Sequence, residues 1–144
     1  MYIRPLLEYA NTVWFPRLLK DIEDIERIQK RFLRWVFPEL LGYQQRLVAA
    51  NISTLAMGRK FYDLCMVHKI VHSDNCHRFF SIAESSLTRG HNLKIVKQFS
   101  RLEIRRLFFS QRIVNSWNQL PANIVYAESS IKFNSLLSNF LGVC

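Results

Sequence analysis

Glycine and proline are scarce in this sequence, which has only four of each among its 144 residues. So few chain-breaking residues, combined with a hydrophobic content of 49%, are untypical of a disordered or low-complexity chain. The length suits one domain with a hydrophobic core, or a piece of a larger protein, and is short for two independent domains. We therefore expect the chain to fold.

Long hydrophobic runs are also missing, because Lys, Arg or Glu interrupts every apolar stretch before the ~18 residues that a membrane-spanning helix needs. The N-terminal residues lack the basic, apolar and small-residue order of a secretory signal. An odd set of three cysteines, Cys65, Cys76 and Cys144, favours reduced thiols over a disulfide framework. These absences predict a soluble intracellular protein, in the nucleus or cytoplasm, with no membrane contact.

Acidic residues are few as well, since 11 Asp and Glu face 20 Lys and Arg, which gives a net charge of +9 and a pI near 9.9. A domain this basic is typical of proteins with a polyanionic partner. Charge alone does not distinguish nucleic acid from an anionic membrane. Seven of the bases, against Glu103 alone, lie in residues 88–112: Arg89, Lys94, Lys97, Arg101, Arg105, Arg106 and Arg112.

What the sequence has in abundance is helical periodicity. Residues 21–37 predict an amphipathic helix with acids first and bases last, and its basic face is more often solvated than functional. Its predicted apolar face consists of Ile22, Ile25, Ile28, Phe32, Leu33, Trp35 and Val36. Similar patterns predict helices near residues 2–10, 43–50, 53–72, 101–117 and 129–141. We expect a mostly α fold, with a helical bundle-like first region and a second helical region.

The residues after His72 are polar and include Gly90, and they show only a brief strand-like alternation in "NLKIV". We take this stretch as a hinge between regions 1–73 and 74–144, or as part of one continuous unit with at most a short β segment. Gly90 offers a positive φ that would admit a phosphate to the backbone, and an ordinary turn explains it equally well.

A basic stripe is predicted on the helix at residues 101–117, where Arg101, Arg105, Phe108 and Arg112 fall within a roughly 60° arc. Guanidinium groups there suit phosphates, and the ring is available for stacking on a base. The alternative is a solvated helix face with Phe108 packed elsewhere. The predicted nucleic-acid-binding residues are Arg89, Lys94, Lys97, Arg101, Arg105, Phe108 and Arg112.

Metal and cofactor sites are not expected. One face of the 53–72 helix carries Cys65, His68 and His72, and Cys76 or His77 would have to complete a tetrahedral zinc site. That spacing matches no compact zinc module, and apolar residues share the face, so core packing is the better interpretation. Trp14, Trp35 and Trp117 are likewise predicted to anchor the core rather than to stack on bases.

Several blocks, in order, resemble the C-terminal portion of the reverse transcriptases of jockey-like LINE elements, which are non-LTR retrotransposons. They are "YIRPLLEYANTVWFP" (Tyr2 to Pro16), "DIERIQKRFLRWV" (Asp24 to Val36), "RGHNLKI" (Arg89 to Ile95), "RRLFFSQRIVNSWNQLP" (Arg105 to Pro121) and "SIKFNSLL" (Ser130 to Leu137). The resemblance implies a helical thumb in residues 1–73 and the connecting region that follows it in residues 74–144.

The family's RNA-directed DNA polymerase activity depends on paired aspartates in a palm domain, and this sequence has no Asp-Asp pair. The resemblance therefore implies a non-catalytic fragment, since Met1 would fall inside a continuous element of the longer protein. Its implied partners are RNA or an RNA/DNA duplex, together with the missing palm or a parent polyprotein. A helical protein-interaction module with an incidental basic surface is the alternative from a different class.

Overall fold

The structure is a computed structural model that describes residues 3–16, 18–83 and 90–142. The predicted mostly helical fold is confirmed. The helices follow one another along the chain as α1 (Ile3–Glu8), α2 (Leu19–Val36), α3 (Tyr43–Ala50), α4 (Leu55–Val71), α5 (Cys76–Phe79), α6 (Glu103–Arg106), α7 (Phe109–Arg112), α8 (Val114–Asn118), α9 (Ala122–Val125) and α10 (Ser130–Leu141).

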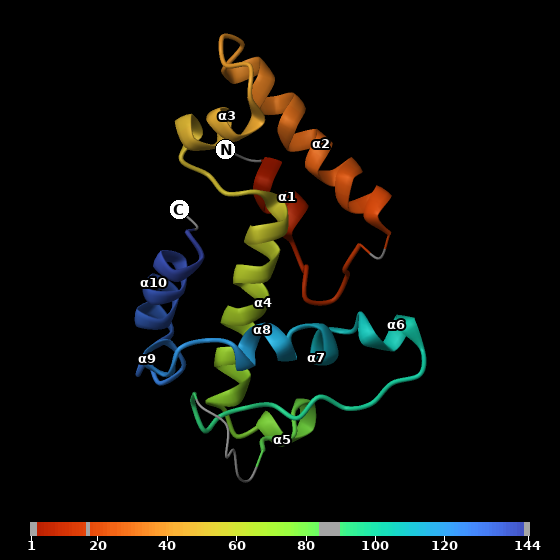
Figure 1. The fold of residues 1–144 in the computed structure, drawn as a ribbon, viewed down its shortest axis with the longest axis vertical. Coiled ribbons are helices and arrows are strands. Elements are labelled where there is room, and N and C mark those ends of the chain that lie inside the picture. The colour runs from red at the N-terminus through yellow and green to blue at the C-terminus, as the bar shows by residue number, and fades with distance from the viewer. Residues whose placement is uncertain (1–2, 17, 84–89, 143–144) are drawn as a thin grey trace.

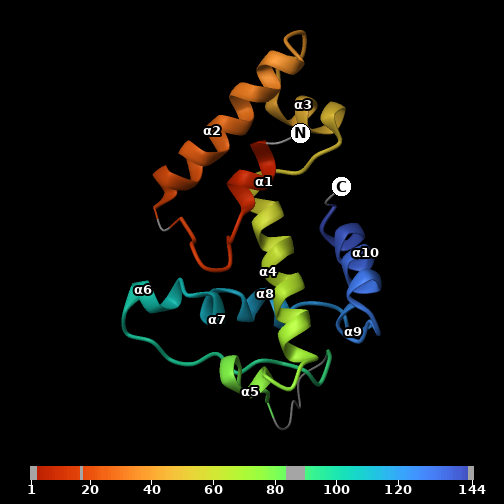
Figure 2. The ribbon, with the colours of Figure 1, turned by 180° about the vertical axis from the view of Figure 1, so that it is seen from behind.

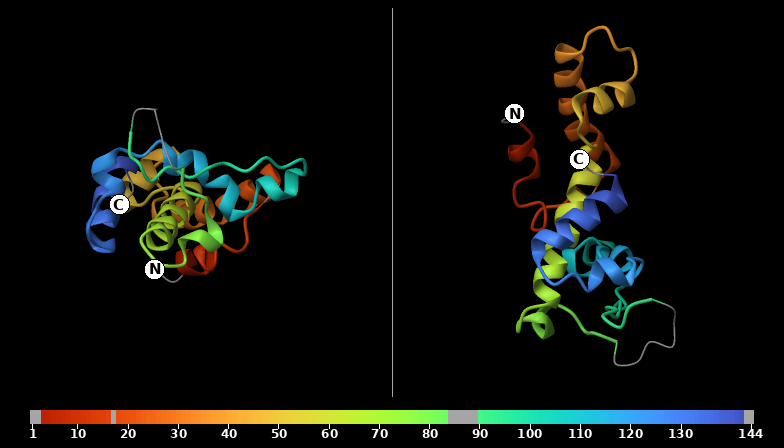
Figure 3. Two further views of the ribbon diagram at one scale, coloured as in Figure 1. Left: turned by 90° about the horizontal axis from the view of Figure 1, so that it is seen from below. Right: turned by 90° about the vertical axis from the view of Figure 1, so that its left-hand side faces the viewer.

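Helix α4 is the axis of the molecule. Figures 1 and 2 show it running through the middle, with α1, α2 and α3 around its first half and α8, α9 and α10 around its second. Viewed nearly end-on in the left panel of Figure 3, α4 separates α10 on one side from α6 on the other. The helix begins at Thr54, whose hydroxyl accepts a hydrogen bond from the Met57 amide at 3.2 Å, as an N-cap residue does.

The main hydrophobic core lies between the second half of α4 and the C-terminal helices. It joins Leu64 and Val67 of α4 to residues far along the chain, among them Trp117 and Phe133, all of them almost fully buried. The Trp117 indole N–H donates to the Leu93 carbonyl at 2.8 Å, so its predicted role as a bonded core anchor is confirmed. The core thus contains residues from both sides of residue 73, because α4 forms one side of it. The division of the chain into regions 1–73 and 74–144 stays a prediction.

Ile82 and Ile95 form an isolated antiparallel bridge beside the core. Its register is fixed by Asn118, whose side-chain oxygen accepts from the Ile95 amide and whose side-chain nitrogen donates to the Ile95 carbonyl, both at 2.9 Å. Gly90 has φ of +125°, which confirms the predicted positive φ. Nearby, the buried His91 ring is hydrogen-bonded to the Trp117 carbonyl at 3.2 Å.

The N-terminal helices pack on α4 through polar contacts. Arg4 bridges Glu8 at 2.8 Å and also donates to the Ser53 carbonyl and hydroxyl, which ties α1 to the residues just before α4. Gly58 permits this close approach, since a Cβ there would lie 2.4 Å from a Glu8 carboxylate oxygen. Charged hydrogen bonds therefore join α1 to the start of α4.

Helix α2 is held by the same kind of contact. Gln29 and Leu33 are its buried residues, and the Gln29 amide donates to the Ser53 carbonyl at 3.1 Å. The Tyr43 hydroxyl of α3 donates to the Glu26 carboxylate, whose second oxygen accepts from the Leu55 amide at 3.2 Å. Burial is the main cause that raises the pKa of Tyr43, and the Glu26 carboxylate adds to the rise.

The predicted apolar face of α2 is too broad. Trp35 is 80% exposed, so its assignment to the core is wrong, and Ile28 is also exposed. At 100° per residue both lie at the edge of the predicted face, more than 90° from Gln29, around which burial is centred. The buried residues of α2 therefore lie toward the Leu33 edge of that face, and the opposite edge stays exposed.

We predict that Asn118→Ala lowers the free energy of unfolding by about 2–3 kcal/mol, because both Ile95 backbone groups lose their partner. Urea denaturation monitored by circular dichroism would measure the loss. Asn115→Ala, an exposed position in the same helix, is the matched control and should change stability by less than about 0.5 kcal/mol. Equal effects of the two variants would show that the Asn118 contacts do not stabilise the fold.

Candidate nucleic-acid interface

The predicted basic stripe is not built on one helix. The chain from residue 101 to 118 forms three short helices, α6, α7 and α8, and the prediction of a continuous helix there is wrong. Leu102 and Phe108 have extended backbones, with ψ of 129° and 145°, and each precedes a new helix. Because Phe108 interrupts the helical repeat, the roughly 60° arc that would align Arg105 with Arg112 does not exist.

The prediction that Arg112 binds a phosphate is wrong. Its guanidinium group forms a salt bridge to Asp63 of α4, with Nε 3.0 Å and Nη2 2.9 Å from Oδ2. The remaining donors bond the Asn11 and Leu107 carbonyls at 3.1 Å. The group also lies over the Phe15 ring, 4.4 Å from its centre. Arg112 is therefore a structural residue, and its predicted phosphate contact is not available.

Asp63 and its neighbours form a buried charged cluster. Asp63 also lies near Asn11, whose amide donates to the Arg59 carbonyl at 3.0 Å. Burial raises the pKa of Asp63, and the Arg112 and Arg59 guanidinium groups oppose that rise. Burial likewise lowers the pKa of Arg59, against the attraction of nearby carboxylates. Removing one member of such a cluster leaves a desolvated charge without its partner.

Three of the predicted cations remain on the surface. Lys97, Arg101 and Arg105 are exposed, and none belongs to the ion pairs found among the described residues. Lys94 is half-buried near Gly90, and Arg89 lies outside the described residues. Arg106, a base not predicted to bind, is exposed and donates to the Ser100 carbonyl at 3.2 Å.

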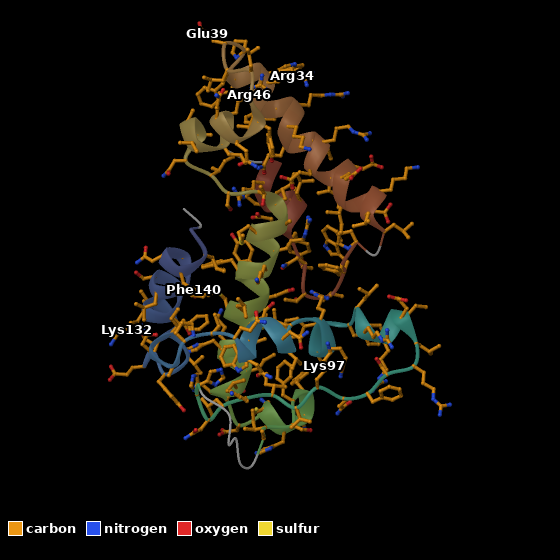
Figure 4. All side chains as sticks on the ribbon, viewed as in Figure 1. Arg34, Glu39, Arg46, Lys97, Lys132 and Phe140 are labelled. Atoms are coloured by element: carbon orange, nitrogen blue, oxygen red, sulfur yellow. The ribbon has the colours of Figure 1, made fainter. Side chains whose placement is uncertain are left out.

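Exposed rings and aliphatic side chains alternate with these cations. Phe99 is 85% exposed and Phe108 is 55% exposed, and Leu102 and Ile104 between them are exposed as well. We call residues 97–108 the basic segment. It carries Lys97 near its start, which Figure 4 labels below α7, and it ends beyond α6 at Phe108. Phe99 was not predicted as a site residue, although its place between Lys97 and Arg101 is the signal that would have indicated it.

Phe108 lies at the border between surface and interior. It lines a small cavity of about 190 Å³ between α6, α7 and the segment before α2, together with Val13, Phe15, Ile104, Leu107, Phe109 and Arg112. One part of the ring therefore faces apolar neighbours and another part faces solvent. Neither of the two predicted roles, stacking on a base or packing in the core, describes this ring completely.

The basic segment does not stand alone on its side of the molecule. Figures 1 and 2 show α6 and the N-terminal end of α2 projecting on the same side of α4. The exposed bases of α2 are Lys20, Arg27, Lys30, Arg31 and Arg34. The Lys30 ammonium lies over the Tyr43 ring, 5.2 Å from its centre, and Arg27 pairs with Asp24 at 3.0 Å. Two elements thus contribute cations to this side.

The cysteine and histidine side chains considered for zinc make other contacts. His68 is buried against Phe133, with ring centres 4.1 Å apart, and it is hydrogen-bonded to the Ala127 carbonyl at 3.2 Å. His72 is hydrogen-bonded to the Val125 carbonyl at 3.1 Å. Burial raises the pKa of the Cys65 thiol to about 11. Within the described ranges, no three His, Cys, Asp or Glu side chains are arranged to hold a metal ion.

No protein-family model, curated protein or solved structure matches this chain. In the part of the chain that the structure describes, no helix combines the length and the hydrophobicity needed to cross a lipid bilayer.

We predict that Arg112→Ala lowers the free energy of unfolding by about 3–5 kcal/mol, because Asp63 would stay buried without its partner. Arg105→Ala removes the same side chain from an exposed site seven residues earlier and should change stability by less than about 0.5 kcal/mol. Thermal and urea denaturation would compare the two. Similar stabilities would show that the salt bridge does not stabilise the fold and would return Arg112 to the candidates for phosphate contact.

We also predict that the protein loses stability as the pH falls below about 6.5, where an unfolded histidine takes up a proton. Burial lowers the pKa of His68 and of His91 in the folded protein, so the unfolded chain binds more protons in this range. With Nε2–H donating to a carbonyl, protonated Nδ1 would be a buried donor that has no partner among the described residues.

The measurement is the free energy of unfolding between pH 8 and pH 5. His91→Gln, which keeps a donor for the Trp117 carbonyl, should flatten the pH dependence, whereas the exposed His77→Gln should not. An unchanged pH profile in His91→Gln would mean that this ring does not resist protonation.

Proposed function

We propose that this chain binds RNA or an RNA/DNA template-primer through its basic segment and has no catalytic activity of its own. The observation that carries the proposal is that Lys97, Arg101 and Arg105 are exposed and take part in none of the ion pairs among the described residues. Cations that are not neutralised within a protein can displace the counterions condensed on a nucleic acid.

The composition of the segment supports the same partner. Exposed Phe99 lies between two of the three cations in sequence, which joins a ring to groups that bind phosphate. Glu103 is the single acidic residue of the segment, so the local charge stays positive. The excess of bases over the whole chain, which gives +9, would add long-range attraction to a polyanion.

The resemblance to LINE reverse transcriptases supplies the biological setting of the proposal. In that setting residues 1–73 are a thumb and residues 74–144 are the connecting region. The chain binds the nucleic acid on which a polymerase palm acts. The sequence has no Asp-Asp pair with which to hold catalytic metal ions. The palm, or a parent polyprotein, is then a partner, and the protein works in the nucleus or cytoplasm.

A protein-interaction module remains the second candidate, and one observation favours it. Large apolar side chains are exposed on α1 and on the segment leading into α2, including Leu6, Val13 and Leu18. Such surfaces are typical of protein contacts. They do not carry the cations of the basic segment, so the two functions can be tested by separate substitutions.

The test is the salt dependence of RNA binding. We predict that replacing Lys97, Arg101 and Arg105 together by Ala flattens the slope of log K against log salt by about 2–3 units, because each phosphate contact contributes ~0.7–0.9. Fluorescence anisotropy with a heteropolymer RNA, at several salt concentrations, measures the slope. Binding should weaken alike for every sequence, since phosphate contacts do not read bases.

The control removes three exposed bases elsewhere, Lys60, Arg78 and Lys132, so that the net charge changes equally. Figure 4 shows Lys132 across the molecule from α6. The control should keep the parental slope. A triple variant that folds and also keeps the parental slope would refute the role of the basic segment and favour the protein-interaction function.

A further inference from the structure

Trp35 occupies an unusual position for a tryptophan. Its side chain is 80% exposed near the C-terminal end of α2, whereas Trp117 is fully buried. Trp14, also predicted to anchor the core, is 37% exposed, so that prediction is wrong, and its indole N–H is bonded to the Tyr9 carbonyl. A buried indole removes a large apolar area from water and so stabilises a fold. The exposed Trp35 ring contributes little of this stabilisation. The packing of the chain leaves this ring available to a ligand.

The neighbours of Trp35 on the helix surface are arginines. At 100° per residue, Arg31 lies about 40° from Trp35 around the helix, one turn earlier, and Arg34 lies on the other side of Arg31. Arg27 continues the row by a further turn, so that the four side chains fall within an arc of about 100°. All four are exposed. We call this set the α2 ridge.

The charge of the ridge is largely unopposed. No acidic residue occurs between Arg27 and Pro38 in the sequence. Arg31 and Arg34 belong to none of the ion pairs among the described residues. Arg27 pairs with Asp24, but both partners are substantially exposed, so the pair is weak and open to competition. The ridge therefore combines an open ring with cations that a polyanion can reach.

We propose that the α2 ridge is a binding site for single-stranded nucleic acid, with the arginines on phosphates and the Trp35 indole stacked on an unpaired base. This inference rests on the proposed function and adds to it a second surface and a class of ligand. Unpaired bases offer their faces to an aromatic ring, whereas the bases inside a duplex already cover one another. Phosphate contacts alone would not require a ring.

The geometry of the helix fits a strand that follows its axis. Arg27, Arg31 and Trp35 are each four residues apart, which places them roughly 6 Å apart along α2. Arg34 broadens the row on one side at its C-terminal end. Figure 4 labels Arg34 near the end of α2 and Lys97 below α7, so the ridge is a separate surface from the basic segment.

The exposed apolar residues Ile28 and Val36 of α2 would also suit a protein contact. The arginines around Trp35 favour a polyanion instead, because a protein that covered the ring would have to neutralise or desolvate them. The ridge therefore favours a nucleic acid over a protein as its ligand.

The experiment titrates the full chain with a twelve-nucleotide oligo(U) and, separately, with a blunt twelve-base-pair RNA duplex. We expect oligo(U) to quench the tryptophan fluorescence of the parent protein, and Trp35→Phe to abolish the quenching. Trp14→Phe is the matched control and should keep it, because Trp14 lies outside the ridge. Trp35→Ala should weaken oligo(U) binding roughly 5- to 150-fold and leave duplex affinity within about 2-fold.

Replacing Arg31 and Arg34 together by Ala tests the cations. The salt slope for oligo(U) should fall by about 1.4, since a phosphate contact on a single strand contributes ~0.7. Exposed side chains can be removed with little effect on folding, and thermal denaturation of each variant verifies this.

The inference is overturned if Trp35→Phe keeps the quenching and Trp35→Ala keeps the parental affinity for oligo(U). It is also wrong if Trp35→Ala abolishes self-association in sedimentation experiments while oligo(U) binding is unchanged, because the ridge is then a protein contact. In both cases, salt-dependent RNA binding that is weakened by the Lys97, Arg101 and Arg105 substitutions leaves the proposed function standing. A parent protein that binds neither RNA refutes the proposed function and the inference with it.

Discussion

The salt bridge between Arg112 and Asp63 holds together parts of the chain that are distant in sequence. Asp63 lies on the central helix α4, Arg112 ends α7, and the same guanidinium group reaches the Asn11 carbonyl in the segment between α1 and α2. Three elements thus meet at one buried cation. Since all three of its guanidinium nitrogens donate to protein acceptors, this arrangement offsets the cost of burying the charge.

The chain on the N-terminal side of this salt bridge exposes its cations to solvent. The helix breaks at Phe108, between Arg105 and Arg112, so that Arg105 faces solvent while Arg112 reaches Asp63. Phe108 is half-exposed at this break, and Phe99 and Arg101 lie before α6 on a connection without helical structure. The break at Phe108 therefore separates the interior salt bridge from the exposed Arg105 of the basic segment, on which the proposed function depends.

Helix α2 shows a related separation of roles. Its buried side chains, Gln29 and Leu33, and its acidic Glu26 attach it to α3 and α4, so that the arginines and Trp35 are left on the opposite side. A helix attached by polar contacts over a narrow face exposes more of its surface than one embedded in a hydrophobic core. That surface is what allows α2 to be proposed as a ligand-binding element in addition to a structural one.

Local patterns in the sequence were sufficient to predict the mostly helical fold, the positions of α2, α4 and α10, the positive φ of Gly90 and the buried Trp117. Helical periodicity and glycine conformation depend on residues within about one turn, so a single sequence contains them. Whether Arg112 is a surface cation or an internal one depends on Asp63, 49 residues away. The exposure of Trp35 depends likewise on how little of α2 its neighbours cover. Such features follow from packing between distant segments, which periodicity does not contain, and only the tertiary structure decided them.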